Sequence, residues 1–383
     1  MGECVVSAGT ALVDGEQTGP VTLRVSDGRI ASIDLPRSDD EVDAAAATVV
    51  PGLLDVHTHG AAGVQVIDGP YADLDRLATF YAEHGVTGFL ATVGGSREHL
   101  LQGVAAVRAH LDGPRGRGAR CLGIHLEGPF ISPRAPGAFR PESVLLPDVR
   151  FFTDLLEVAG GHVRLLTIAP ETPGADAVID LALRHGVTCS IGHSVATAEQ
   201  VVQAVDAGVR GVTHLFNAMA PFHHRKPGPV GAALIDPRLI CELVADGVHV
   251  HPTAARLATL AKGVAGIALV SDSIAATGLP DGDYELEEQR VTVSSGEARL
   301  ADGTLAGSTL TLDLAVANLA RWCEMPLTDA VRAATEGPAG LMGMTAERGR
   351  ISVGRDADLA AFDADHRLLW TMVGGHLHGA GVT

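Results

Sequence analysis

The stretch Pro51-Gly-Leu-Leu-Asp-Val-His-Thr-His-Gly60 is a short apolar run that ends on two histidines, His57 and His59. Side chains alternate between the two faces of a β-strand, so residues two apart point to the same side. The two imidazoles are therefore close enough to bind one metal ion. The same spacing also fits an ordinary strand that ends at the surface, so the interpretation depends on the rest of the chain.

Strand-like and helical runs alternate through the middle of the chain. This alternation predicts a parallel sheet covered by helices, and eight units in a row predict a closed (β/α)8 barrel, a TIM-type fold of about 250 residues. We expect residues 309–323 to form the last outer helix and residues 284–306 to form a β-hairpin inserted before it. The strand-like runs are residues 51–60, 86–93, 120–127, 163–168, 187–191, 211–214, 240–245 and 267–272.

Both ends of the chain show shorter, alternating β patterns. Residues 21–25 and 29–33 flank an Asp-Gly turn, which is a hairpin signal, and residues 357–362 and 368–373 form a similar pair. We expect the two ends to meet in a small β-sandwich domain of residues 1–50 and 350–383, with residues 51–349 forming the barrel.

Composition narrows the class of protein. Apolar residues make up 46% of the chain but aromatic residues only 4%, which fits a core of buried parallel strands and packed helices. The net charge of -18 argues against a nucleic-acid or anionic-membrane partner. The five cysteines form no CxxC motif, and no signal segment or long apolar run is present. We therefore expect a soluble cytoplasmic protein.

Ligand-type residues recur where the expected strands end. The active sites of such barrels lie at the carboxyl ends of the strands, so these side chains would meet at one rim. Any one of them could be structural, but together they favour a metal centre for Zn²⁺, Fe²⁺, Mn²⁺ or Co²⁺. A bound ion lowers the pKa of its water, so that hydroxide attacks an amide, and a carboxylate such as Asp272 can carry the proton. The candidates are His57, His59, Glu127, His193, His214 and Asp272.

Several longer motifs surround these residues. This pattern resembles the amidohydrolase superfamily, and nearly the whole chain is similar to its N-acetylglucosamine-6-phosphate deacetylase family. The resemblance implies hydrolysis of an amino-sugar phosphate to glucosamine 6-phosphate and acetate. The matching motifs are the 51–60 stretch, His125-Leu-Glu-Gly-Pro-Phe130, Gly192-His-Ser194, Thr213-His-Leu-Phe-Asn-Ala-Met219, Ala245-Asp-Gly-Val-His-Val250, Leu269-Val-Ser-Asp272 and Leu305-Ala-Gly-Ser308.

The resemblance also implies roles for single residues. One ion would be bound by Glu127, His193 and His214, and a second by His57 and His59 together with Glu127. Asp272 would be the general acid and base. Zn²⁺ is the first choice of metal, with one or two ions in each subunit of a homodimer. The substrate would contact Ala138, Asn217, Ala218, Arg225, His249, Leu305, Ala306 and Gly307, with Arg225 and the 217–218 backbone at the phosphate.

One loop departs from the family pattern. The family usually has Lys-Gly-Ala-His where this chain has Pro136-Gly-Ala-Phe139, so a histidine contact to the sugar is replaced by Phe139. Deacetylation remains the expected reaction. The change makes a C4 epimer, N-acetylgalactosamine 6-phosphate, the alternative substrate.

Two other interpretations explain the sequence less well. A dihydroorotase or hydantoinase typically bridges two metals with a carbamylated strand lysine, but the two lysines of this chain, Lys226 and Lys262, lie in an expected loop and an expected helix. A non-catalytic barrel scaffold would be expected to lack metal ligands, whereas all six positions are filled here.

Overall fold

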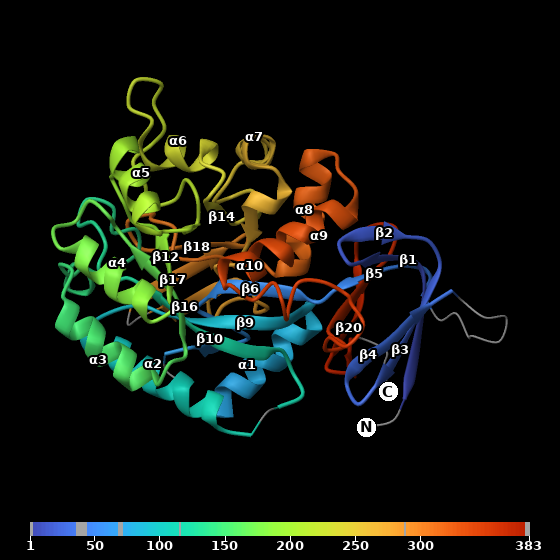
Figure 1. The fold of residues 1–383 in the computed structure, drawn as a ribbon. Helices are drawn as coiled ribbons and strands as arrows, with labels where there is room; N and C mark the ends of the chain where they lie inside the picture. Colours follow the sequence, from blue (N-terminus) through green and yellow to red (C-terminus); the bar gives the residue numbers. More distant parts are fainter. Residues whose placement is uncertain (1–2, 36–43, 68–71, 115, 287–288, 380–383) are drawn as a thin grey trace.

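The computed structural model describes residues 3–35, 44–67, 72–114, 116–286 and 289–379, which form two large sheets (Figure 1). One sheet consists of eight parallel strands in the spatial order β15-β14-β13-β12-β11-β10-β9-β6. This confirms the expected (β/α)8 barrel. The strands are β6 (Leu53–Thr58), β9 (Val86–Val93), β10 (Arg120–Glu127), β11 (Val163–Ile168), β12 (Thr188–Ile191), β13 (Gly211–Val212), β14 (Ile240–Leu243) and β15 (Ile267–Leu269).

The barrel closes where its first and last strands approach each other. Beyond the end of β15, Ser273 forms a parallel bridge with Thr58 of β6. In the same place the Asp272 amide donates a hydrogen bond to the His57 carbonyl, with 2.9 Å between nitrogen and oxygen. The seam of the barrel therefore carries two of the candidate site residues.

Helices surround this sheet, and their ends follow local sequence signals. Helix α5, for example, begins with a capping box in which Thr197 and Gln200 bond each other's backbone, and it ends at Gly208 in the left-handed conformation. No helix of the described residues is long and apolar enough to cross a membrane. The helices are α1 (Ala72–Glu83), α2 (Arg97–Asp112), α3 (Val149–Ala159), α4 (Ala175–Arg184), α5 (Ala198–Ala207), α6 (Gly228–Ile235), α7 (Pro252–Lys262), α8 (Leu312–Cys323), α9 (Leu327–Ala333) and α10 (Glu336–Leu341), with 3₁₀ turns at Pro141–Ser143 and Val264–Gly266.

The expected last helix, residues 309–323, starts later and is not the last. It corresponds to α8, and two further short helices follow. Helix α10 packs against β15 and β6. A Cβ atom at Gly337 would lie only 2.0 Å from the Ile267 carbonyl oxygen, so the close contact between α10 and β15 requires glycine at this position.

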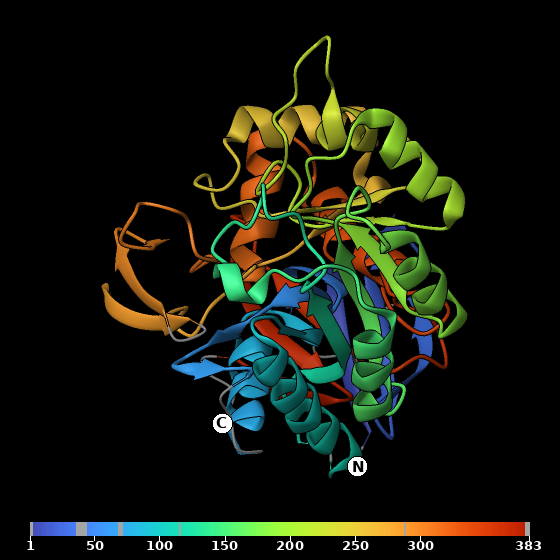
Figure 2. The same ribbon diagram turned by 90° about the vertical axis from the view of Figure 1, so that its left-hand side faces the viewer.

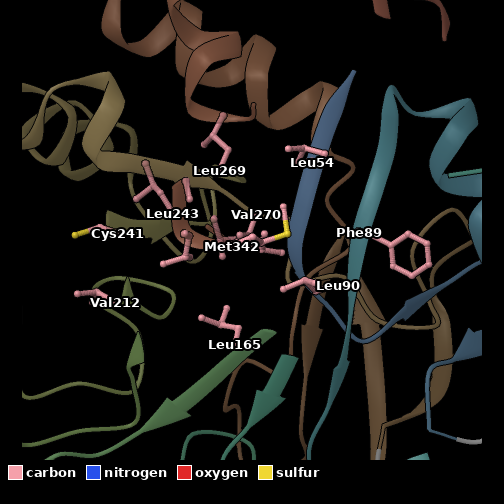
Figure 3. Packing of buried hydrophobic residues seen from close by; sticks show 14 of the residues in the cluster. Leu54, Phe89, Leu90, Leu165, Val212, Cys241, Leu243, Leu269, Val270 and Met342 are labelled. Atoms are coloured by element: carbon pink, nitrogen blue, oxygen red, sulfur yellow. The ribbon is translucent and has the colours of Figure 1, made fainter. Parts of the chain in front are cut away.

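The barrel is held together by an aliphatic core. Figure 3 shows side chains of this core from several strands, among them Leu54, Leu90, Leu165 and Leu269. Each of these leucines is at most 1% exposed. Because both faces of each strand are covered, the strands are rich in aliphatic residues, which fits the high apolar and low aromatic content of the sequence.

The second large sheet is built from both ends of the chain, as expected, in the order β21-β20-β19-β5-β1-β3-β4. The described strands form one continuous sheet, and apolar residues from both ends of the chain, such as Val25 and Leu359, pack in a single cluster. We propose to divide the chain into residues 1–50 with 350–383 and residues 51–349. The strands are β1 (Cys4–Val13), β2 (Glu16–Thr18), β3 (Val21–Ser26), β4 (Arg29–Asp34), β5 (Ala44–Pro51), β19 (Leu359–Phe362), β20 (Leu368–Val373) and β21 (His376–His378).

The segment before α8 is a separate small sheet, and the expected hairpin is wrong in its number of strands. Three antiparallel strands are present, β16 (Gly282–Leu286), β17 (Gln289–Ser294) and β18 (Glu297–Arg299). Figure 2 shows this sheet standing out from the side of the barrel. Its apolar residues pack with Ile274 and Ala306. A two-stranded ribbon, β7 (Gly60–Ala61) with β8 (Val64–Gln65), follows β6.

Candidate metal centre and active site

The six predicted ligand-type residues meet at the carboxyl ends of the barrel strands. Each of them ends a strand or lies within three residues of its end. Five are almost fully buried, and His59 has an 11% exposed side chain. The fold therefore brings together residues that are up to 215 positions apart in the sequence. They are His57, His59, Glu127, His193, His214 and Asp272.

Glu127, His193 and His214 form the tighter of two groups. The Nε2 atoms of His193 and His214 lie 3.1 and 3.0 Å from Glu127 Oε1 and 3.1 Å from each other. Burial alone would raise the pKa of Glu127, but the surrounding histidines, first among them His57, hold it well below its usual range. Glu127 is therefore an ionised carboxylate inside the protein.

His57 and His59 form the second group around the same carboxylate. Their Nε2 atoms are 3.3 Å apart. His57 Nε2 is 3.4 Å from Glu127 Oε1, and His59 Nε2 is 3.1 Å from Glu127 Oε2. Asp272 Oδ1 lies 3.5 Å from both imidazoles. Glu127 thus stands between the two groups and offers an oxygen to each.

The geometry of the first group fits a metal ion. His193 Nδ1 donates to the Ala135 carbonyl at 3.0 Å, so in the neutral ring Nε2 carries a lone pair and no proton. That lone pair faces the Glu127 carboxylate, which also has no proton to donate. A cation between them removes the repulsion. Ligands of one tetrahedral zinc ion stand about 3.4 Å apart, close to the spacing of these three atoms.

Three of the site residues have a left-handed backbone. The φ angles are +47° at His193, +31° at His214 and +50° at Asp272. This conformation costs energy in residues with a side chain and persists where the surroundings impose it. All three lie two or three residues past the end of a barrel strand. The unusual backbone accompanies the convergence of His193 and His214 on Glu127 and the approach of Asp272 to the imidazoles of the second group.

His249 lies beside this centre and is held by Asp246. Its Nδ1 bonds Asp246 Oδ2 at 2.7 Å, and Asp246 Oδ1 accepts the amides of Val248 and His249, each at 2.8 Å. Burial lowers the pKa of His249, but the hydrogen bond and charge of Asp246 outweigh it, so that the pKa rises above its ordinary value. Burial would raise the pKa of Asp246, and the contacts with His249 lower it.

A cavity of about 390 Å³ opens above these groups. It has room for a single sugar unit, and its wall includes Gln289 and Arg299 from the inserted sheet. Most of the predicted substrate contacts line it. They are Ala138, Asn217, Ala218, His249, Leu305 and Gly307, together with Phe139.

Two predicted contacts do not line the cavity. Ala306 is fully buried and packs in the cluster behind the wall. Arg225 lies in the loop between β13 and α6 that extends from the molecule (Figures 1 and 2), where its Nη1 bonds His224 Nε2 at 2.9 Å. The structure therefore does not bring Arg225 to the cavity of its own chain.

Sequence reasoning missed two acidic groups at the site, Asp246 and Glu242. Glu242 Oε2 lies 2.8 Å from His57 Nδ1. Its signal in the sequence was a single carboxylate in an otherwise apolar strand.

His125 lies close to His57 and Glu242, but its Nε2 and Nδ1 face the hydroxyls of Thr167 and Thr92 at 2.8 and 3.3 Å. Burial first, and the charge of His57 second, lower its pKa well below the usual range.

The amidohydrolase family model matches residues 48–377 of the chain. The N-acetylglucosamine-6-phosphate deacetylase of Bacillus subtilis (strain 168) is 37% identical over 362 residues, which cover 92% of this chain and 91% of that protein. The N-acetylgalactosamine-6-phosphate deacetylase of Escherichia coli O157:H7 is also 37% identical, over 359 residues that cover 93% of this chain and 94% of that protein.

A solved structure supports the same relationship. A mutant N-acetyl-D-glucosamine-6-phosphate deacetylase from Mycobacterium smegmatis, in complex with N-acetyl-D-glucosamine-6-phosphate, matches with a TM-score of 0.92 and 34% identity. The match covers 98% of this chain and 99% of that one. The extent of these matches, together with a buried cluster of histidines and a carboxylate at the barrel mouth, shows that the chain belongs to the amidohydrolase family, in the group of the N-acetylglucosamine-6-phosphate deacetylases.

Proposed function

We propose that this protein hydrolyses the acetamide of N-acetylglucosamine 6-phosphate to glucosamine 6-phosphate and acetate. The observation that carries the proposal is the convergence of Glu127, His193 and His214 below a cavity of about 390 Å³ that also exposes Asp272. The relatives named for this reaction support the choice of substrate.

We propose that Glu127, His193 and His214 bind one divalent ion and that His57 and His59 bind a second together with Glu127. Zn²⁺ is our first choice, and Fe²⁺, Mn²⁺ and Co²⁺ suit the same nitrogen and oxygen atoms. Such an ion polarises a carbonyl group and lowers the pKa of water towards neutrality.

Asp272 is the proposed general base and acid. Its carboxylate takes a proton from the attacking water as the oxygen bonds to the acetamide carbon. It then gives this proton to the sugar nitrogen as the carbon–nitrogen bond breaks, which releases acetate and the free amine. The backbone of Asp272 is fixed on both sides, because its amide bonds the His57 carbonyl and its carbonyl accepts the Ser308 amide at 2.7 Å.

His249 is the proposed donor to the acetamide oxygen. Asp246 occupies its Nδ1 and favours the protonated ring, so Nε2–H remains available on the cavity side. A donor fixed before the reaction stabilises the negative charge that develops on the carbonyl oxygen.

The phosphate is assigned to the loop that begins at Asn217 and Ala218 and to Arg225. Because Arg225 is remote from the cavity of its own chain, we propose that the protein is a homodimer in which Arg225 reaches the partner's cavity. A guanidinium can donate two parallel hydrogen bonds to a phosphate. The free cysteines of the described residues fit a cytoplasmic enzyme.

N-acetylgalactosamine 6-phosphate is the second candidate substrate. Phe139 favours it, because its ring lines the cavity and packs edge-on against His193, with 5.1 Å between ring centroids. A phenyl ring cannot donate a hydrogen bond to a sugar hydroxyl. The relative named for the galacto substrate is also 37% identical.

Acetate release by metal-loaded protein tests the proposal. The substrates to compare are N-acetylglucosamine 6-phosphate, its galacto epimer and unphosphorylated N-acetylglucosamine. We expect preferential turnover of the gluco phosphate. Turnover of the epimer alone would keep the chemistry and change the substrate, and no turnover of any of the three would overturn the proposal.

A further inference from the structure

Glu242 is a carboxylate in the interior of the barrel. It lies on β14 between Cys241 and Leu243, and all three residues are 0% exposed. Removing an ionised carboxylate from water costs several kcal/mol unless partners compensate it. The residue is therefore expected to have a specific partner and a specific task.

The partners of Glu242 belong to both groups of the candidate metal centre. Its Oε2 lies 2.8 Å from His57 Nδ1 and accepts the His214 amide at 3.2 Å. His57 belongs to the second group and His214 to the first. Because the side chain of His57 is completely buried, this contact helps to determine the orientation of its ring.

The contact also determines which nitrogen of His57 can bind a metal. Glu242 Oε2 already accepts one N–H, so it acts as an acceptor towards Nδ1 as well, and Nδ1 carries the proton. In the neutral ring Nε2 then has a free lone pair. That atom faces His59, Glu127 and Asp272 at 3.3 to 3.5 Å.

A separate ion between Glu242, His57 and His125 explains the contacts less well, although their ligand atoms lie within 4.8 Å of one another. Both nitrogens of His125 face threonine hydroxyls. His57 would also have to lose both protons to bind ions on its two sides. A hydrogen bond from His57 Nδ1 to Glu242 leaves the threonine contacts of His125 in place and keeps one proton on His57.

We propose that Glu242 is a positioning residue that holds His57 with Nε2 ready to bind the second metal ion. This inference rests on the proposed two-ion centre. A carboxylate behind a ligand histidine fixes the ring and makes it more basic, and loss of such a partner typically weakens metal binding 10- to 100-fold. Glu242 therefore helps to decide whether the chain holds one ion or two.

The test is a Co²⁺ titration of protein stripped by a chelator, followed by elemental analysis and visible absorption, without substrate. We expect the wild type to bind two ions per chain. Glu242→Leu, which removes the acceptor but keeps the volume, should bind the first ion within threefold of wild type and the second about 10- to 100-fold more weakly. Glu242→Gln keeps an acceptor oxygen, so its affinity for the second ion should lie between those of the wild type and Glu242→Leu.

Glu171→Gln is the matched control for Glu242→Gln. Glu171 also accepts hydrogen bonds beside a candidate ligand, from the Ser194 hydroxyl at 2.7 Å and the Val195 amide at 2.6 Å, but it does not contact His57. The Glu171→Gln variant should bind two ions, like the wild type. Three outcomes would overturn the proposal. The wild type could bind only one ion, Glu242→Leu could bind the second ion as tightly as the wild type, or a folded Glu242 variant could lose affinity for both ions equally. Since no substrate is used, failure of the deacetylase assignment would not affect the result.

Discussion

Asp246 and His249 form a partly buried pair in which each residue stabilises the charged form of the other. The contact with His249 lowers the pKa of Asp246 against the effect of burial, and the contact with Asp246 raises the pKa of His249. A histidine with a raised pKa stays protonated to higher pH, so in this protein His249 keeps both ring N–H groups further into the neutral range. The carboxylate therefore favours the charged form of a ring that lines the cavity.

Asp246→Asn should move the alkaline limb of kcat/KM to lower pH. Without the negative charge the pKa of His249 falls, so the protonated donor is lost earlier as pH rises. The measurement is the pH profile of acetate release. Asp283→Asn, at an exposed residue paired with Arg290, is the control and should leave the limb in place. If the alkaline limb of Asp246→Asn stayed at the wild-type pH, His249 would not have the proposed role.

Asp272→Asn should lower kcat about 10²- to 10⁴-fold, because an amide cannot take a proton from water or return it to the amine. The KM should change little, since Asp272 is not assigned to the sugar or the phosphate. Steady-state acetate release measures both constants. Asp281→Asn, a loop carboxylate that accepts the Ser295 amide at 2.6 Å, serves as the control. A kcat within tenfold of wild type would contradict the mechanism.

Among single residues, the sequence predicts the ligand-type residues at the ends of the barrel strands, but it does not reveal the acidic residue that contacts them from within a strand. His57, Glu127 and His214 were found because residues at the carboxyl ends of barrel strands share one rim. Glu242 lies within its strand, and a lone glutamate there does not reveal whether it faces a histidine or a loop. Arg225 lies away from the cavity of its own chain, and its proposed contact involves a second chain, which no pattern in one sequence describes. The chemical roles of all these residues stay predictions.

The loop that carries Phe139 is held by the inserted sheet. Gln289 Nε2 of β17 donates to the Ala138 carbonyl at 2.8 Å, so the sheet and the loop form one wall of the cavity. Specificity is therefore expected to depend on how these two elements meet, and only indirectly on the barrel.

Phe139→His should raise the ratio of kcat/KM for the gluco substrate over the galacto substrate about tenfold. The epimers differ in the direction of one hydroxyl, and an imidazole can bond it whereas a phenyl ring cannot. Parallel assays on both sugars measure the ratio. Phe139→Leu keeps the loop apolar and should leave the ratio within about threefold. The same ratio in both variants would show that position 139 does not contact that hydroxyl.

Eight barrel strands were predictable because each contains an apolar run, and most of these runs are followed by a glycine or a ligand-type residue. The inserted sheet was not, since β18 has only three residues, Glu297–Arg299, too few to show alternation. Helices α9 and α10 were missed for a similar reason. They have seven and six residues, and Pro338 and two glycines in α10 oppose a helix in local propensity. Packing against β15 and β6 stabilises α10.

At the scale of the whole molecule, ion pairs connect the barrel to the terminal sheet. Arg120, at the start of β10, and Arg348 contact Asp356 and Asp358, which precede β19. Burial raises the pKa of Asp358, and the two arginines oppose that effect. This cluster lies at the opposite end of β10 from Glu127, so it contributes to stability and not to chemistry.

Arg348→Ala should lower the free energy of unfolding by about 3 kcal/mol, because it leaves Asp358 buried with one partner fewer. Urea unfolding followed by circular dichroism measures the change. Arg367→Ala is the control, since Arg367 pairs with Asp365 at the surface and should contribute little. Equal stability of the two variants would mean that the cluster does not hold the sheets together.

Arg225→Ala should raise the KM for the phosphorylated sugar about 10- to 100-fold, through loss of a charge-assisted contact, and leave that for the unphosphorylated sugar almost unchanged. If Arg225 reaches the partner, mixed dimers of Arg225→Ala and Asp272→Asn chains should regain activity, because one cavity then has both residues intact. Co-expression with two affinity tags, followed by acetate assays, tests this. A monomer in solution, or inactive mixed dimers, would contradict it.

The terminal sheet has a consequence for how the chain is made. Strand β5 pairs with β19, and Pro51 lies opposite Leu359, so the two partners are separated by about 300 residues. At 5 to 20 residues per second a ribosome needs about 15 to 60 s to cover that distance. Throughout that time β5 presents an unpaired edge. The nascent chain is therefore open to chaperones, or to mispairing with a neighbour on the same polysome, until the last strands emerge.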